Sequence, residues 1–458
     1  MASDSAPSIA DGNLLDGLTQ PQQDAVTHVD GPLLVLAGPG SGKTRVITHR
    51  MAHLVLNVGI APWNMLAITF TNKAAGEMRQ RVAQVLTPRQ ADALTVATFH
   101  AFCARLLREH AEAVGLKPGF SIYDTGDQRQ AAKRAITELE INTKNFSPAA
   151  VLGTISNAKN ELMDPDSYET AAGDFYTRTV SRIYHRYQSI LTEGNAVDFD
   201  DLLLKTVQLL KEHTAIRDQL RQRYQYLLVD EYQDTNHAQF VIAHALAAEH
   251  GNICVTGDPD QSIYGWRGAN IGNILDFERH YPDARVIRLE QNYRSTGRIL
   301  AVADALIQNN QRRKHKQLWT DNELGEPVQV VRLRDEHHEA QWLVDQFRQA
   351  HDELSIPWSG MACFYRVNSL SRVLEDEFRA ANIPYQVARG TAFYDRKEIK
   401  DAIAYLRVIV NPVDEVNLLR IINTPTRGIG DKTLKAVQAE AVARDQTLWE
   451  TLGQTGRL

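Results

Sequence analysis

The sequence contains only three cysteines among its 458 residues, at positions 103, 254 and 363, and no two of them form a CxxC pair. This scarcity argues against a disulfide framework or a structural zinc site and predicts a reducing compartment. No apolar run approaches the roughly 20 residues that span a bilayer. The small, polar and acidic N-terminal stretch resembles neither a signal peptide nor a transit peptide. The sequence therefore predicts a cytoplasmic protein with no membrane partner.

An excess of positive charge is also missing, because the formal net charge at pH 7 is −6. A negative net charge does not indicate nucleic-acid binding, although a basic groove can coexist with an acidic exterior. The hydrophobic fraction of 43% and the charged fraction of 23% are typical of an ordinary globular protein. At this length we expect about three domains.

Short apolar segments that end in polar or acidic residues alternate with helical stretches along the chain. The apolar segments are residues 65–70, 94–99, 226–230, 253–258 and 286–290. This alternation predicts an α/β fold with a parallel sheet. The charged, alanine-rich segment between about residues 123 and 195 predicts a helical insertion. A second α/β set is expected from about residue 286 through 328–333 and 361–365, followed by helices beyond residue 396.

Residues 37–44 read AGPGSGKT and lie between the apolar run 33–36 and an expected helix start. In this context the backbone N–H groups can cradle phosphates, Lys43 can reach the β- and γ-phosphates, and Thr44 can ligate Mg²⁺. Ala37 departs from the usual pattern, which has glycine there. A glycine-rich turn with an incidental lysine is the alternative. We predict that the chain binds a nucleoside triphosphate with Mg²⁺ through this loop, using Gly38, Gly40, Ser41, Gly42, Lys43 and Thr44.

The apolar segment 226–229 ends in two carboxylates, Asp230 and Glu231. Asp230 is placed to hold Mg²⁺ through water, and Glu231 to orient or deprotonate the attacking water. Acidic pairs at strand ends are common, so this pair indicates a phosphoryl-transfer site only in combination with the phosphate loop. Upstream, the amide of Gln22 could read an adenine edge because it both donates and accepts. A surface glutamine in a glutamine-rich turn explains Gln22 equally well.

Residues 255–270 read VTGDPDQSIYGWRGAN. Gln261 follows an acidic strand end, where it could sense a γ-phosphate. Tyr264, Trp266 and Arg267 are side chains of the kind that stack single-stranded bases and grip phosphates. A buried core would explain one aromatic residue here, but hardly this whole polar loop. The segment therefore predicts coupling between nucleotide state and base stacking.

Together these segments resemble the superfamily 1 DNA helicases of the UvrD/Rep/PcrA group. The matching stretches follow the family's order: LTQPQQ (18–23), AGPGSGKT (37–44), TFTNKAAGEM (69–78), TFHAF (98–102), DFDDLL (198–203), VDEYQDTN (229–236), GDPDQSIYGWRGAN (257–270), LEQNYRS (289–295) and GTAFYDRKEIKD (390–401). The resemblance implies two RecA-like lobes, each with a helical insertion. Lobe 1A would comprise 1–118 and 196–287, insertion 1B 119–195, an incomplete lobe 2A 288–388, and part of insertion 2B 389–458.

The resemblance also assigns roles on the nucleotide side. Gln22 would read the adenine, and Arg45 and Tyr293 would sandwich the base through cation–π and stacking contacts. Arg294 would act as an arginine finger from the second lobe, an effect that can be worth ~10³–10⁵ in rate. A surface salt bridge is the alternative for Arg294.

On the DNA side, the stacking argument and the resemblance place four aromatic residues along a single-strand channel: Phe70, Phe199, Tyr264 and Trp266. Asn72, Thr98 and His100 would supply polar contacts to phosphates. A core position for Phe70 and a structural hydrogen bond for His100 remain open.

Two further segments carry DNA-binding predictions. The basic run 311–316 either contacts DNA or forms a solvated face. Arg427, Gly428 and Gly430 lie in a turn that resembles the hairpin of a helix–hairpin–helix element. The glycines there would let backbone N–H groups meet duplex phosphates. A plain helix–helix turn would also favour these residues.

The resemblance implies an ATP-driven helicase that moves 3′→5′ on single-stranded DNA and acts at single–double-strand junctions, in repair or replication, at the nucleoid. The family's later motifs would follow Leu458, so we expect an incomplete motor that binds ATP and single-stranded DNA but unwinds poorly. The motor part of a helicase–nuclease and a non-catalytic, ATP-gated binding module are the alternatives.

Overall fold

The computed structural model describes residues 14–388 and 396–454. The chain divides into two compact units. Unit 1 combines Met1–Gly325 with Asp401–Leu458, and unit 2 is Glu326–Lys400. The predicted nucleotide and DNA sites lie on unit 1, so most of the description concerns that unit.

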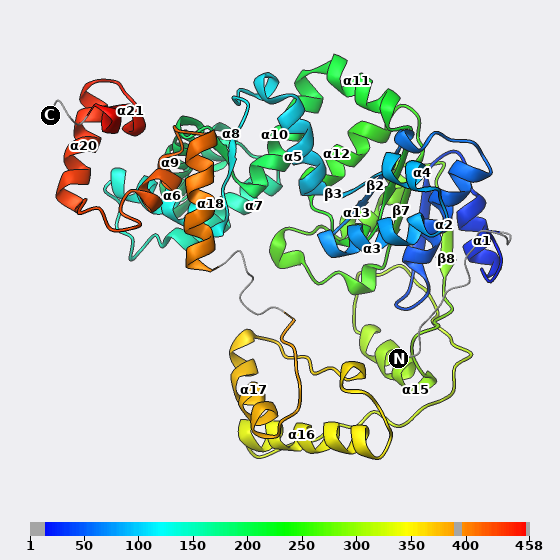
Figure 1. Ribbon diagram of the computed structural model, residues 1–458. Helices are drawn as coiled ribbons and strands as arrows, with labels where there is room; N and C mark the ends of the chain where they lie inside the picture. The colour runs from blue at the N-terminus through cyan, green and yellow to red at the C-terminus, as the bar shows by residue number, and fades with distance from the viewer. Residues whose placement is uncertain (1–13, 389–395, 455–458) are drawn as a thin grey trace. The chain divides into compact units, whose positions relative to one another are not determined.

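Unit 1 contains a six-stranded parallel sheet (Figure 1). Its order is β3-β2-β6-β7-β1-β8, and its strands are β1 (Leu33–Ala37), β2 (Met65–Thr69), β3 (Thr95–Thr98), β6 (Tyr226–Val229), β7 (Ile253–Gly257) and β8 (Arg285–Leu289). The α/β class with a parallel sheet is therefore confirmed. The segment from 286 was expected to open a second sheet, and this placement was wrong, because β8 pairs along its length with β1.

Successive residues of β1 face opposite cores, which explains why the strand is apolar throughout. Leu34 and Leu36 join one core with residues of α5 (Phe99–Glu109), α10 (Phe199–Glu212), α11 (Thr214–Arg223), α12 (His237–Ala247), α13 (Gly272–Leu275) and α14 (Phe277–His280). Leu33 and Val35 join the other with residues of α1 (Gln20–Thr27), α2 (Lys43–Leu56) and α3 (Asn72–Ala83). The short helix α4 (Pro88–Ala93) precedes β3. Helices on both faces hold the sheet rigid, so the loops at its ends are held in place.

The predicted helical insertion is confirmed. It contains α6 (Thr125–Glu138), α7 (Pro148–Asn160), α8 (Pro165–Ala171) and α9 (Phe175–Glu193), which have their own buried core. A two-stranded parallel sheet of β4 (Ser121–Ile122) and β5 (Ala196–Val197) closes the insertion at its base.

Helices also follow residue 396, as predicted: α18 (Lys397–Val410), α19 (Glu415–Ile421), α20 (Asp431–Ala443) and α21 (Leu448–Gly453). Within unit 1, Val416 of α19 joins the core of the insertion. Asn411 Nδ2 donates to the carbonyl oxygen of Gly194 at 2.8 Å. The later helices are thus bound to the insertion by buried contacts.

Unit 2 is built on α16 (Glu336–Asp352) and α17 (Ser371–Ala380), whose Phe347 and Phe378 rings lie 5.3 Å apart. Helix α15 (Gly297–Ile307) belongs to unit 1. The strands expected at 328–333 and 361–365 are not formed. Val330 is 98% exposed, and no ladder partner faces either segment among the described residues. Of the helices that the structure describes, none combines the length and apolarity that a membrane crossing needs.

Candidate nucleotide site and single-strand surface

The carboxyl ends of parallel strands meet at one edge of a sheet, and ligands of open α/β folds bind there. Each strand of the large sheet is followed by predicted site residues. These are the phosphate loop after β1, Phe70 after β2, His100 after β3, Asp230 and Glu231 after β6, Gln261 after β7, and Tyr293 and Arg294 after β8. The fold therefore brings together residues that are far apart in the sequence.

The phosphate loop connects β1 to α2 with two glycines in the left-handed region. Gly40 has φ 65° and Gly42, which precedes the first residue of α2, has φ 88°. Glycine adopts this backbone without the penalty that a Cβ would impose. No described side chain caps the first turn of α2. Its uncapped N–H groups, with Lys43 as the first helical residue, have the arrangement that the motif requires, and phosphate binding there stays a prediction.

Gln22 lies directly beside this loop and is 3% exposed, so it is not a surface glutamine. Its Nε2 donates to the carbonyl oxygen of Ser41 at 2.9 Å, and its Oε1 accepts from the backbone N–H of Thr19 at 3.1 Å. Both ends of the amide are therefore engaged, and they hold the start of α1 against the loop. A contact with adenine stays a prediction.

The two carboxylates after β6 have different environments. Asp230 is 6% exposed, and Thr256 Oγ1 donates to it at 2.6 Å. Burial, and next the charge of Glu231, raise the pKa of Asp230 to about 6. Glu231 has φ 52°, and its Oε2 lies 3.7 Å from Lys43 Nζ. Strained backbone of this kind clusters at functional sites, and here it turns the Glu231 side chain toward the phosphate loop.

A pocket of about 320 Å³ lies between these groups. It is lined by Thr44, Thr69, Phe70, Thr71, Ala74, Glu77, Asp230, Glu231, Gln233, Asp234, Gln261, Ile263 and Tyr264. The same cavity thus touches residues predicted for nucleotide binding and residues predicted for DNA binding. Asp234 Oδ1 is buried there without a partner among the described residues, and burial with Glu231 raises the pKa of Asp234 to about 6. This oxygen-rich, anionic lining fits a divalent cation.

The segment after β8 lies against the phosphate loop. Asn292 Nδ2 donates to the carbonyl oxygen of Pro39 at 2.6 Å. The backbone N–H of Tyr293 donates to the carbonyl oxygen of Gly40 at 3.0 Å. This arrangement brings Arg294 to the loop, where the finger prediction requires it. Tyr293 is 47% exposed and Arg45 is also exposed, so both side chains are accessible to a base, and their contact with one stays a prediction.

Phe70, Tyr264 and Trp266 form a continuous line of rings, here called the aromatic row. The ring centroids of Phe70 and Tyr264 lie 4.9 Å apart, and those of Tyr264 and Trp266 6.3 Å apart. The Arg267 guanidinium lies 4.6 Å from the Trp266 ring centroid. Trp266 is 69% exposed, which suits a stacking platform rather than a core. Phe70 lines the pocket, so the row begins at the nucleotide side.

The other predicted DNA residues lie at helix starts. Phe199, the first residue of α10, is 45% exposed, and its ring lies edge-on to His100 at 6.1 Å. Burial lowers the pKa of His100, which favours the neutral ring. Thr98 accepts from the N–H of Ala101 at 3.2 Å and so caps α5. Asn72 begins α3 and is exposed.

Three cations of the basic run 311–316 are paired with carboxylates, so a solvated face does not describe them. Arg313 lies 3.1 Å from Asp260, and Lys316 pairs with Asp258 and Asp260. Lys314 pairs with Glu278. Asp258 is 0% exposed and accepts from Gln261 Nε2 at 2.7 Å. This cluster was not predicted from the sequence, although the acidic pair in GDPDQ marks its position.

Arg427, Gly428 and Gly430 lie in the turn between α19 and α20. The Arg427 guanidinium donates to the carbonyl oxygens of Ile421 at 2.7 Å and Ile422 at 3.1 Å, so it caps the end of α19. Gly428 has φ 74°. Two helices joined by a turn are present, as both the helix–hairpin–helix prediction and the plain-turn alternative require, and the duplex contact stays a prediction.

Comparison with known proteins supports the same interpretation. Residues 18–282 match the model of the UvrD/REP helicase N-terminal domain, and residues 287–449 that of the UvrD-like helicase C-terminal domain. The first match covers more than half of the chain. Domains of this type fit a RecA-like arrangement, which agrees with the parallel sheet described above.

Individual relatives are also similar over nearly the whole chain. The chain is 46% identical over 441 residues to the ATP-dependent DNA helicase PcrA of Bacillus subtilis (strain 168), a match that covers 96% of this chain and 60% of the relative. It is 44% identical to proteins with the same description from Leuconostoc citreum and Staphylococcus aureus (strain Mu50 / ATCC 700699), over 96% of this chain and 59% and 60% of those relatives. The chain thus spans about 60% of the length of these curated relatives.

Proposed function

Because the chain belongs to the UvrD/REP helicase family, we propose that it is the ATP-hydrolysing part of a DNA motor. The motor would move 3′→5′ along single-stranded DNA and open duplexes at single–double-strand junctions, in DNA repair or replication. The direction and the setting rest on likeness to the family. We also propose the division into lobes 1A and 2A and insertions 1B and 2B with the boundaries given above.

The observation that carries this proposal is the shared pocket. Thr44, Glu231 and Gln261 line the same cavity as Phe70 and Tyr264. The proposed γ-phosphate site and the start of the aromatic row therefore border one cavity, so a change at the phosphate would not need a long relay to reach the rings. Coupling of this kind is what separates a motor from a simple nucleotide-binding fold.

Each residue has a role that its position permits. Lys43 would neutralise phosphate charge and Glu231 would orient the attacking water. Arg294, which lies beside Gly40 of the loop, would stabilise charge on the transferred phosphoryl group. Thr44 and Asp230 would hold Mg²⁺, which when bound neutralises charge on the phosphates. Burial and the charge of Glu231 raise the pKa of Asp230 to about 6, so a divalent cation beside this carboxylate would favour its ionised form.

Hydrolysis of ATP by the chain, measured with and without oligothymidylate, tests the proposal. We expect stimulation by the oligonucleotide. Lys43→Ala should reduce hydrolysis by about 10²- to 10³-fold, the usual effect of removing a donor to developing charge. Trp266→Ala should leave nucleotide affinity unchanged and weaken DNA binding roughly 5- to 150-fold, the range that the loss of one stacked base predicts.

Two results would contradict this account. DNA affinity that is intact in Trp266→Ala would remove the aromatic row from the DNA site. Binding of ATP and DNA without any stimulation of hydrolysis would favour the ATP-gated binding module instead.

A further inference from the structure

Helix α7 of the insertion ends in two adjacent polar residues, Lys159 and Asn160, that are buried against the sheet domain. Lys159 is 1% exposed and Asn160 6% exposed. Fully buried lysines are rare unless they are paired, because desolvation of the charge is costly. The groups that Lys159 and Asn160 contact therefore indicate why these two side chains are buried.

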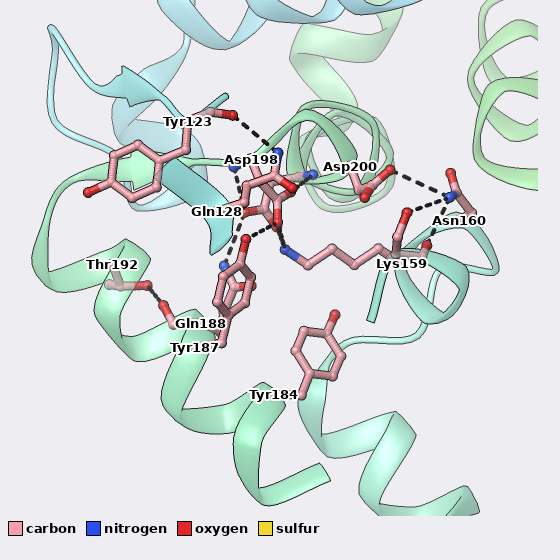
Figure 2. Close-up of polar contacts among 12 residues, drawn as sticks. Tyr123, Gln128, Lys159, Asn160, Tyr184, Tyr187, Gln188, Thr192, Asp198 and Asp200 are labelled. Atoms are coloured by element: carbon pink, nitrogen blue, oxygen red, sulfur yellow. Dashed lines mark hydrogen bonds and ion pairs between the residues drawn. The ribbon is translucent and has the colours of Figure 1, made fainter. Parts of the chain in front are cut away.

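Lys159 crosses from the insertion to the first turn of α10 (Figure 2). Its Nζ donates to Asp198 Oδ2 at 2.7 Å and to Asp201 Oδ1 at 2.8 Å. The Tyr187 hydroxyl also donates to Asp198 Oδ2, at 2.9 Å. Burial opposes the charge on Lys159, but the two carboxylates outweigh it, so its pKa lies above the ordinary value. The ammonium therefore stays charged and holds both acids.

These two acids are the residues that cap α10. Asp198 Oδ1 accepts from the N–H of Asp201 at 2.7 Å, and Asp201 Oδ2 accepts from the N–H of Asp198 at 3.1 Å. Phe199 lies between them and is 45% exposed. Since Lys159 fixes the acids that define this turn, it also fixes the direction in which Phe199 leaves the surface.

Asn160 supports the other end of the DNA surface. Asn236 Nδ2 donates to its Oδ1 at 2.5 Å. A Cβ at Gly268 would lie 3.4 Å from the Cβ of Asn160, so the Asn160 side chain fills the space behind this glycine. Gly268 has φ 81° and ends the turn Gly265–Arg267, which carries Trp266. Asn160 thus lies directly behind the exposed end of the aromatic row.

We propose that Lys159 and Asn160 are positioning residues through which the helical insertion sets the spacing between Phe199 and the aromatic row. The spacing decides whether successive bases of one strand can stack on both. This inference rests on the proposed function, because it assumes that these rings receive bases. Neither residue touches the nucleotide site, so nucleotide binding should not depend on them.

The proposal is tested by measuring how protein variants bind two DNA strands, one with all its bases and one with abasic sites. Affinity is measured for oligothymidylate and for the same backbone with abasic sites, using the wild-type chain, Lys159→Met and Asn160→Ala. Stacking is sequence-tolerant and worth enough that either variant should lose about tenfold on the intact oligonucleotide. On the abasic strand, where nothing stacks, the variants and the wild-type chain should bind alike. Lys159→Arg should restore part of the loss, because it keeps the charge.

Lys133→Met is the matched control, since Lys133 is an exposed lysine on α6 of the same insertion. It should behave as wild type on both strands. Asn160→Ala removes no buried charge and so decides the question if Lys159→Met does not fold. Equal losses on intact and abasic strands, or no loss on either, would overturn the positioning role. A wild-type chain that binds both strands equally would instead overturn the stacking surface, and this inference with it.

Discussion

At the scale of single residues, Gly40 shows how closely the site is built. A Cβ at this position would lie 2.7 Å from Arg294 Cβ and 2.8 Å from Asn292 Nδ2, and the backbone φ of 65° disfavours any side chain. Gly40→Ala should therefore push the segment 292–294 away from the loop. The strained backbone alone costs roughly 1–2 kcal/mol, and we expect about tenfold weaker ATP binding in a titration with a fluorescent nucleotide.

Gly76→Ala provides the control for this substitution. Gly76 lies inside α3, and a Cβ there would meet nothing within 4 Å. Alanine should stabilise the helix by roughly 1 kcal/mol and leave nucleotide affinity unchanged. An unaltered affinity in Gly40→Ala would show that residues 292–294 can retreat at no cost, which would remove the argument for Arg294 as a finger.

At the scale of elements, Lys316 holds the segment after α15 on the loop that carries Gln261. Its side chain is 4% exposed and pairs with Asp258, which is fully buried. Lys316→Met leaves Asp258 with an uncompensated charge, and breaking such a pair costs roughly 3–5 kcal/mol. We expect a fall of this size in the free energy of unfolding, measured in urea, together with slower hydrolysis because Gln261 shares Asp258.

The matched variant is Lys73→Met. Lys73 is also paired, with Glu77 at 3.9 Å, but its side chain is 85% exposed. An exposed pair of this kind contributes roughly 0.3–0.5 kcal/mol. If both substitutions cost the same, the buried cluster does not anchor the segment.

At the scale of elements, the positions of strands and helices were predicted better from the sequence than the contacts that these elements make with one another. The apolar runs at 65–70, 94–99, 226–230 and 253–258 all form strands, since hydrophobic pattern and strand ends are local properties. Pairing is not local: nothing in residues 286–290 says that β8 lies beside β1. The run 311–316 shows the same limit, because the acids that neutralise it lie 36 to 58 residues away in the chain.

The candidate site shows the same difference between local patterns, which the sequence predicts, and contacts between distant segments, which it does not. Motifs predicted the phosphate loop, the carboxylates and the aromatic row, because each is a short local pattern. The sequence could not show that Gln22 is already engaged by Ser41, or that Lys159 reaches the first turn of α10. Such contacts depend on how separate elements pack, and only the structure provides them.

At the scale of the whole molecule, unit 1 is closed by contacts between residues about 280 positions apart. Arg407 of α18 lies 2.6 Å from Asp127 in the insertion, and Arg134 lies 2.6 Å from Glu415. Tyr123 donates to Asp414 at 2.8 Å, and both residues are buried. Polar groups as well as the buried Val416 therefore fasten the later helices to the insertion, and the ion pairs make this junction sensitive to charge.

Arg407→Met tests that junction and gives it a pH dependence. Burial, and next the charge of Asp124, raise the pKa of Asp127, whereas Arg407 lowers it. Without Arg407 the pKa of Asp127 rises further, so its ionised form destabilises the folded chain at every pH above that value. As the pH falls through the folded-state pKa, Asp127 takes up a proton and the penalty is relieved. The variant should thus lose more stability at pH 8 than at pH 5, by up to about 3 kcal/mol at the higher pH, measured in urea.

Asp127→Asn in the Arg407→Met background should recover most of the loss at pH 8 and flatten the pH profile, because no buried charge then remains unpaired. Arg444→Met is the comparison variant, since Arg444 pairs with Glu440 on the exposed surface of the same helical region; its effect should stay below roughly 0.5 kcal/mol at either pH. A deficit in Arg407→Met that does not change with pH would show that packing of Val416 and Asn411, rather than charge, fastens the later helices to the insertion.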